Sequence, residues 1–279
     1  MVSVTTGLQA ARRPRAFVGV TGPGAEDYLQ RMVSNDVAAL APGEACDALL
    51  LTPKARVIAP LRVVRRCAED FLLLTEPELG AKVRSELLRL RFTARVEIEL
   101  EEHRSHLLVG AGAEAPPRAL AVPNPDYGVP ALEIVGEPEP PGGALLDDDA
   151  LEELRIRART PRYGREIDDR VLPAEAGLVE RAVSFAKGCY PGQEPVARLH
   201  YRGHANRGLR VLLLATDDLP AYDTPVVSGG KDVGRVTSAV RATEGVLALA
   251  YVRVEVPPEA ELHVGSARAR ALHLPPARP

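Results

Sequence analysis

The sequence has few cysteines, and no two of them form a short motif. Cys46, Cys67 and Cys189 are scattered over 279 residues, and no CxxC pair occurs. Scattered thiols do not make a disulfide framework, and they are typical of a reducing compartment. They also fall short of the four thiolates that an iron–sulfur cluster usually takes from one chain. The sequence therefore argues against both a disulfide-stapled secreted fold and a resident four-cysteine cluster.

Long apolar runs and an excess of basic charge are also missing. No apolar run approaches the ~18 residues that a membrane span needs. The first residues, MVSVTTGLQAARRPRAF, lack the ordered basic, apolar and small-residue regions of a signal peptide. The net charge is -3, whereas a protein that binds nucleic acid over its whole surface is usually basic. We therefore expect a cytoplasmic protein with no membrane partner and no direct nucleic-acid partner.

The length and the mixture of patterns predict more than one structural unit. A chain of 279 residues exceeds the comfortable size of a single core, so two or three units are expected. Residues 16–20, AFVGV, are typical of a strand, and residues 77–92 show helical spacing at Val83, Leu87 and Leu90. Strands and helices follow one another without strict alternation, which predicts an α+β fold.

The second half of the chain contains a linker, a helix start and a run of short strands. Residues 137–143, EPEPPGG, are typical of a loop or linker. Asp147 to Asp149 suit the N-terminal cap and first turn of the helix that follows. From Leu209 onward the pattern changes to short strands, with a hairpin turn at Gly229-Gly230. This stretch predicts a small, independent β-barrel or sandwich.

Residues 184–208, SFAKGCYPGQEPVARLHYRGHANRG, contain the densest chemistry in the chain. Gly188 and Gly192 bracket Cys189, so the backbone there is expected to bend near the surface. Nearby cations favour the thiolate, which is the reactive form of cysteine. The candidate cations are Lys187, Arg198, Arg202 and Arg207. We predict that Cys189 is a functional thiol and that Cys46 and Cys67 are structural.

A metal site is a competing interpretation of the same segment. His200 and His204 are four residues apart and could share a helical face with a metal, with Cys189 as a third ligand. The stretch between the two histidines is not convincingly helical, so we predict no metal site.

The octet KGCYPGQE at Lys187–Glu194 resembles the signature of the YgfZ family, a relative of the glycine-cleavage T-protein. The resemblance covers nearly the whole chain and is weakest at residues 111–145. The other similar segments are Tyr28–Leu40, Leu50–Val64, Arg159–Leu178 and Val233–Val240.

The resemblance implies a T-protein-like fold around a central opening in which folates bind. Two α+β, ferredoxin-like units would form the folate-binding-type region 1–205, approximately residues 1–45 with 145–205, and 46–120. Residues 206–279 would form the C-terminal β-barrel. Such a protein would support the assembly or repair of iron–sulfur clusters, including those of tRNA-modifying enzymes. Its partners would be client enzymes or assembly proteins, and a cluster would be held only transiently, if at all.

The resemblance also implies a set of binding residues. Cys189 inherits the role of the family's functional thiol. Arginine side chains can take folate carboxylates through paired hydrogen bonds. The candidates for binding tetrahydrofolate or a related folate are Lys187, Tyr190, Gln193, Glu194, Arg157, Arg162, Arg198 and Arg207.

Two departures from the T-protein pattern bear on the alternative function, a folate-dependent one-carbon (aminomethyl) transferase. Where those enzymes carry an aspartate after the isoleucine of a strand, this chain has Ala59 and Pro60, which cannot relay a proton. Where T-protein relatives carry a glutamate that binds the pteridine ring, this chain has Arg157, which cannot accept hydrogen bonds. Both departures favour an accessory protein over an enzyme.

Overall fold

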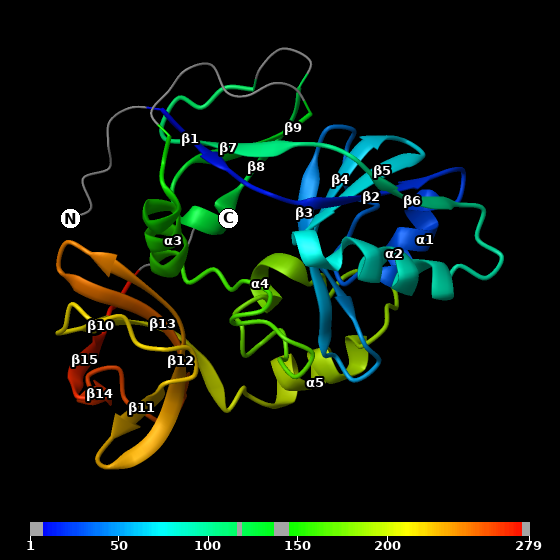
Figure 1. Ribbon diagram of the computed structural model, residues 1–279. Coiled ribbons are helices and arrows are strands. Elements are labelled where there is room, and N and C mark those ends of the chain that lie inside the picture. Colours follow the sequence, from blue (N-terminus) through cyan, green and yellow to red (C-terminus); the bar gives the residue numbers. More distant parts are fainter. Residues whose placement is uncertain (1–7, 116–118, 137–144, 275–279) are drawn as a thin grey trace.

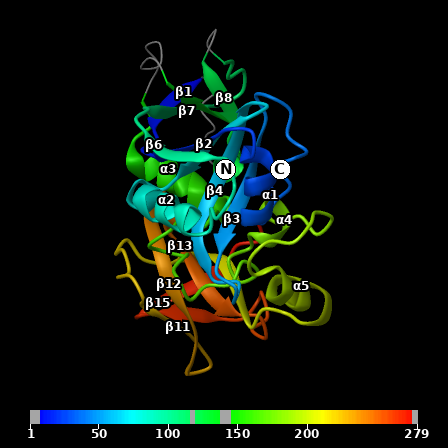
Figure 2. The same cartoon turned by 90° about the vertical axis from the view of Figure 1, so that its right-hand side faces the viewer.

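The computed structural model describes residues 8–115, 119–136 and 145–274. These residues form two open sheets and a closed barrel, with short helices between them (Figures 1 and 2). The mixed helix and sheet content and the separate barrel confirm the predicted fold class. Within this part of the chain, no helix is both long and apolar enough to cross a membrane.

The first sheet has five strands and is entirely antiparallel. Its strands are, in spatial order, β3 (Ala45–Leu51), β4 (Val57–Cys67), β5 (Asp70–Thr75), β2 (Ala16–Thr21) and β6 (Glu97–Glu101). Two helices pack on one face, α1 (Ala25–Met32) and, after the short turn η1 (Pro77–Leu79), α2 (Gly80–Arg89). The succession β2-α1-β4-β5-α2-β6 is the ferredoxin-like arrangement, to which β3 adds an edge strand.

The two faces of this sheet have different neighbours because side chains alternate along each strand. Val18 and Val20 of β2 pack toward the helices, with Leu29 of α1 and Leu87 of α2. Phe17 points the other way and packs in a core that also contains residues of the second sheet.

The second sheet has four strands and packs against that other face. Its strands are β1 (Gln9–Arg12), β7 (Ser105–Val109), β9 (Ala131–Val135) and β8 (Leu120–Pro123). The turn η2 (Pro125–Tyr127) follows β8, and α3 (Asp148–Arg157) covers the sheet through Leu151 and Leu154. The Asp147 side chain accepts a hydrogen bond from the Ala150 amide at 2.7 Å, which confirms the predicted helix cap.

Strand pairing groups the chain differently from the predicted division. Residues 1–45 were expected to form a unit with residues 145–205. Instead β2 and α1 belong with β3 to β6, because β2 lies between β5 and β6 in the sheet. Strands β8 and β9 fall in residues 111–145, where the resemblance is weakest. The predicted linker at 137–143 lies outside the described residues.

The barrel closes in the order β10-β13-β12-β11-β14-β15, with β15 pairing back onto β10. Its strands are β10 (Arg207–Leu214), β11 (Pro225–Ser228), β12 (Lys231–Ala242), β13 (Gly245–Arg253), β14 (Leu262–Val264) and β15 (Ala267–Ala271). Gly229 and Gly230 have φ values of 55° and 76° and form the predicted hairpin turn between β11 and β12. Helix α3 also contacts the barrel, where Ile156 packs with Val211 and Leu249.

The segment between α3 and the barrel contains two more helices, α4 (Val179–Ala182) and α5 (Gln193–Arg202). Its apolar side chains pack with Leu49 and Val57 of the first sheet and with Tyr251 of the barrel. The Tyr251 hydroxyl donates to the Glu166 carbonyl at 2.8 Å. This segment therefore joins the first sheet to the barrel.

Candidate functional site: a charged cavity and an exposed thiol

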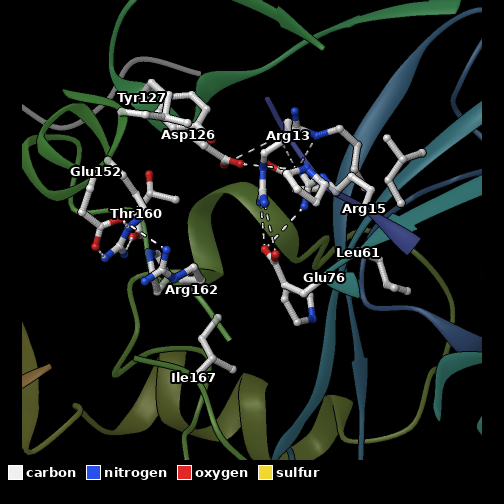
Figure 3. A pocket seen from close by; sticks show the side chains of 18 of the residues that line it. Arg13, Arg15, Leu61, Glu76, Asp126, Tyr127, Glu152, Thr160, Arg162 and Ile167 are labelled. Carbon is white, nitrogen blue, oxygen red and sulfur yellow. Dashed lines mark hydrogen bonds and ion pairs between the residues drawn. The ribbon is translucent and has the colours of Figure 1, made fainter. Parts of the chain in front are cut away.

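A cavity of about 370 Å³ lies where the two open sheets meet α3 and the segment after it (Figure 3). Seven guanidinium groups and five carboxylates line it, together with apolar side chains such as Leu61, Leu178 and Ile167. The arginines are Arg12, Arg13, Arg15, Arg62, Arg155, Arg162 and Arg181, and the acidic residues are Asp47, Glu76, Asp126, Asp148 and Glu152. The lining carries more positive than negative groups, which suits an anionic ligand.

Most of these charges are paired within the cavity wall. Arg13 donates to both oxygens of Glu76 at 3.1 and 2.8 Å. Arg15 donates to both oxygens of Glu133 at 2.8 and 3.0 Å, and Glu133 is completely buried behind the lining. On the opposite side, Arg155 donates to Glu152 at 2.9 and 2.6 Å.

A second group of ion pairs centres on Asp47 and Asp126. Arg62 donates to Asp47 Oδ1 at 3.0 and 2.8 Å. Arg181 bridges the two carboxylates, with Nε 2.8 Å from Asp47 Oδ2 and Nη2 2.5 Å from Asp126 Oδ1. Arg181 thus connects α4 to both sheets.

The arginines keep the buried carboxylates ionised. Burial raises the pKa of Asp126, but Arg62, Arg181 and Arg15 outweigh it, so the pKa of Asp126 is lowered overall. Burial also raises the pKa of Glu133, and Arg15 and Arg62 again lower it below the ordinary value. Carboxylates held in this way are weak proton acceptors.

Several polar groups of the cavity wall lack a protein partner. Arg13 Nε and Thr160 Oγ1 are buried and have no hydrogen-bond partner in the described chain. Arg12 is exposed and makes no ion pair with any described residue, and Arg162 is 3.4 Å from Glu152 with its side chain 39% exposed. These groups can donate to a ligand without breaking a strong ion pair.

The signature octet lies outside this cavity. Lys187 is buried, and its Nζ donates to the carbonyls of Val33 and Asn35 at 2.6 and 2.8 Å. Burial lowers the pKa of Lys187 to about 8, and Asp36 opposes this effect. Tyr190 is also buried, its ring lies 5.3 Å from Lys187 Nζ, and burial raises its pKa to about 12. Lys187 therefore anchors the octet, and its ammonium group also interacts electrostatically with the Cys46 thiol.

The far end of the octet is held by close backbone packing. Gly192 has φ of 84°, and a Cβ atom there would lie 2.6 Å from the Thr52 carbonyl oxygen in the turn between β3 and β4. Only glycine accepts both the conformation and the contact. Cys189 lies between the two anchors and is exposed. The fold thus fixes the segment on both sides of the thiol.

The other two cysteines have different environments. Cys46 is half-buried on β3, and burial, with Asp47 adding to it, raises its pKa to about 12. Cys67 ends β4 and is exposed.

Of the eight predicted binding residues, the structure places only Arg162 in the cavity lining. Arg157 pairs with Glu153 and Glu244, on the side of α3 toward the barrel. Arg198 pairs with Glu194 on the exposed face of α5, at 3.0 Å. Arg207 pairs with Glu175 at 3.0 Å. Lys187, Tyr190 and Gln193 belong to the anchored octet and to the start of α5. The three arginines outside the cavity are thus paired with carboxylates.

The histidines of the segment do not converge. His200 stacks on Phe185 with ring centroids 4.3 Å apart, and α5 ends at Arg202, before His204. Among the described residues, no group of three or more His, Cys, Asp or Glu side chains is arranged to hold a metal ion.

Sequence reasoning missed most of the cavity wall. The missed charged residues are Arg13, Arg15, Arg62, Glu76, Asp126, Arg155 and Arg181. The cluster of arginines at positions 12, 13 and 15 was a usable signal, because three cations beside a strand are unusual unless they have partners. Asp126 gave no signal, since it lies in the stretch where no structure was expected.

The strand that would carry a transferase aspartate has Ala59 and Pro60 at the expected position. Ala59 is completely buried in the core beneath α1 and α2. Pro60 lines the cavity. Neither position supplies a proton-transfer group.

Comparisons with known proteins find a similar C-terminal domain and a similar overall fold. Residues 195–277 match the model for the CAF17, C-terminal beta-barrel domain. The aminomethyltransferase T of the glycine cleavage system from Bartonella henselae has the same fold, with a TM-score of 0.81 at 19% identity over 97% of this chain and 86% of that one.

Curated relatives extend over most of the chain. The tRNA-modifying protein YgfZ of Edwardsiella ictaluri is 29% identical over 93% of this chain and 88% of its own length. The aminomethyltransferase of Rubrobacter xylanophilus is 27% identical over 88% of this chain and 74% of its own length. The octet, the barrel, the shared fold and these relatives together support a YgfZ-type protein with an aminomethyltransferase-like fold.

Proposed function

We propose that this protein is an accessory factor that supports the assembly or repair of iron–sulfur clusters, including those of tRNA-modifying enzymes. The observation that carries the proposal is the presentation of Cys189, an exposed thiol on a segment anchored by buried Lys187 and by Gly192. One thiol can be a single ligand of a shared cluster or a nucleophile in sulfur exchange. A cluster at Cys189 would therefore need ligands from a second chain or a small thiol.

A folate is the ligand that we propose for the cavity. The volume of about 370 Å³ falls within the range of small-molecule sites. The residues present fit an anionic ligand with a flat ring: Arg12 and Arg162 have donors available for carboxylates, and Tyr127, Leu61 and Leu178 supply apolar surface. Thr160 and Arg13 offer the buried donors that lack a protein partner. When bound, a folate would supply a carrier for a one-carbon group.

One-carbon transfer by this chain is the weaker alternative. Ala59 and Pro60 stand at the position of the expected aspartate, and neither relays a proton. The carboxylates of Asp47, Glu76 and Asp126 are all bound by arginines. This favours an accessory role over catalysis.

The test is complementation of a strain that lacks the gene, scored by the activity of several [4Fe–4S] enzymes. Wild type should restore activity, and Cys189→Ala should not. Cys67→Ala is the matched control, because Cys67 is also exposed but lies outside the octet. Equal rescue by Cys189→Ala and Cys67→Ala would refute the proposed role of the thiol. Turnover of tetrahydrofolate with a one-carbon donor by the purified protein would instead support the transferase.

A further inference from the structure

The segment that carries Cys189 begins in the cavity wall. Arg181, in α4, directs its guanidinium group to Asp47 and Asp126. The same segment continues through Ser184 to Lys187, whose ammonium group points to the turn that follows α1. This turn, Ser34 to Asp36, contacts the segment at several points.

Ser34 is the central contact of the turn and is completely buried. Its hydroxyl donates to the Ala182 carbonyl at 2.6 Å and accepts from the Leu49 amide at 2.8 Å. Its own carbonyl accepts from the Ser184 amide at 3.0 Å. Ser34 thus ties the end of α4 to β3.

Asn35 connects the same turn to the cavity wall. Its Nδ2 donates to the backbone carbonyl of Asp47 at 2.7 Å and to that of Arg181 at 3.2 Å. Its own carbonyl accepts from Lys187 Nζ. A shift of the Arg181 backbone would therefore disturb Asn35, and through it a hydrogen bond that holds Lys187.

We infer that Arg181 is a positioning residue that links ligand occupancy of the cavity to the reactivity of Cys189. An anionic ligand in the cavity competes with Asp47 and Asp126 for Arg181. When Arg181 leaves these carboxylates, the Ser34–Asp36 turn loosens and the Lys187 ammonium group is freed to approach the thiol. A nearby cation favours the thiolate, so Cys189 becomes more reactive.

This linkage is reciprocal if it acts at equilibrium. A ligand that changes the free energy of the thiol segment must itself bind with a different affinity when the segment is altered, and by the same factor. The inference rests on the proposed importance of Cys189, but its test needs neither a client enzyme nor complementation.

The experiment measures the alkylation rate of each cysteine by iodoacetamide at pH 7, resolved by mass spectrometry, in Arg181→Gln and Arg181→Lys. The readout is the alkylation rate of Cys189 divided by that of Cys67. A change that affects both exposed thiols equally then cancels. Arg181→Gln should raise this ratio about fivefold or more. Arg181→Lys should raise it less, because lysine keeps the charge but cannot bridge two carboxylates as a planar fork does. Arg31→Gln, which removes an exposed ion pair on α1, should leave the ratio unchanged.

Two further measurements distinguish the proposed linkage from a general loss of structure in the Arg181 variants. Cys46 should stay protected in every variant, since its labelling reports loss of the native core. Adding Lys187→Met to Arg181→Gln should abolish the increase, because the cation that approaches the thiol is then absent. An unchanged ratio in both Arg181 variants, or an increase that survives Lys187→Met, overturns the inference.

A ligand arm tests the reciprocal effect in the wild-type protein. Saturating tetrahydrofolate should raise the same ratio, and alkylation of Cys189 should change tetrahydrofolate affinity by an equal factor. Binding without any change of the ratio contradicts the linkage. Absence of binding would count against the proposed folate and leave the Arg181 result to decide the linkage.

Discussion

Arg181 and Lys187 lie on one segment, and their cations are held in different places. Arg181 Nη2 lies 2.5 Å from Asp126 Oδ1 in the cavity, whereas Lys187 Nζ lies 2.6 Å from the Val33 carbonyl outside it. The arginine is bound by two carboxylates, whereas the lysine donates to carbonyls and makes no ion pair with a described residue, although Asp36 favours its charge. The lysine is therefore the more easily released of the two.

Replacing Lys187 by methionine should impair function without unfolding the protein. The variant removes two hydrogen bonds to buried carbonyls, and we expect a loss of about 1–3 kcal/mol in the free energy of unfolding. Complementation should fall toward the level of Cys189→Ala. Urea unfolding and enzyme activities in the complemented strain measure the two effects. Full complementation by a folded Lys187→Met protein would show that the anchor is dispensable.

Replacing Asp126 by asparagine should be strongly destabilising. Asp126 is buried, and its loss leaves Arg62 and Arg181 with less compensating charge. Breaking such a buried pair costs about 3–5 kcal/mol, which urea unfolding can measure. Asp27→Asn is the matched control, because its pair with Arg31 is exposed and should contribute less than about 1 kcal/mol. Similar values for the two variants would mean that the cavity network does not stabilise the fold.

Stability should fall only modestly between neutral pH and about pH 5, where burial lowers the pKa of His106, and then fall steeply in acid. The pKa values of Asp126, Glu133 and Glu76 are lowered in the folded protein. Their contribution is complete above the unfolded values of about 4 and is lost as the pH falls through the folded values. Urea unfolding at a series of pH values tests this. A marked decrease in the free energy of unfolding between pH 7 and pH 5 would mean that groups other than these three carboxylates control the pH dependence.

The three cysteines should separate in alkylation experiments on the native protein. Cys189 and Cys67 are exposed and should react, whereas Cys46 should react only after denaturation, because burial raises its pKa to about 12. We expect Cys189 to react fastest. Mass spectrometry of a time course distinguishes the sites. Rapid native labelling of Cys46 would contradict the packing around β3.

Folate binding, if it occurs in the cavity, should depend on Arg12 and Arg162. Substitution of either by glutamine should weaken binding of a polyglutamylated folate by about tenfold, since each charged hydrogen bond contributes about 1.5–3 kcal/mol. The same substitution at Arg157, Arg198 or Arg207 should have little effect, because these arginines do not line the cavity. Calorimetry at increasing salt should show falling affinity. An effect confined to the second group of arginines would place the ligand elsewhere.

Local patterns predicted the elements that depend on local chemistry. The cap at Asp147, the hairpin at Gly229-Gly230 and the barrel strands all follow from residues close together in the sequence. Strands β8 and β9 were missed because they are short and flanked by proline, so only the pairing of β9 with β7 and of β8 with β9 makes them strands.

The sequence predicted the thiol of the candidate site but not the wall of the cavity. The octet indicated Cys189, and the structure shows that thiol exposed. The cavity wall could not be assembled from the sequence, because its partners lie far apart: Arg15 meets Glu133 and Arg181 meets Asp47. Lys187 was expected beside a ligand, but it is buried and donates to the turn after α1. That turn lies far from the octet in the sequence, so the octet alone could not predict this contact.

The contacts of Ser34 also bear on the order in which the chain folds. Its hydroxyl meets the Ala182 carbonyl across a sequence separation of 148 residues, and Lys187 meets Val33 across 154. Contacts of such separation close large loops and form late. During synthesis the first sheet therefore folds while the octet is still absent, and the thiol segment docks onto it afterwards. The anchored setting of Cys189 therefore exists only once the chain has been made past the octet and the first sheet has folded.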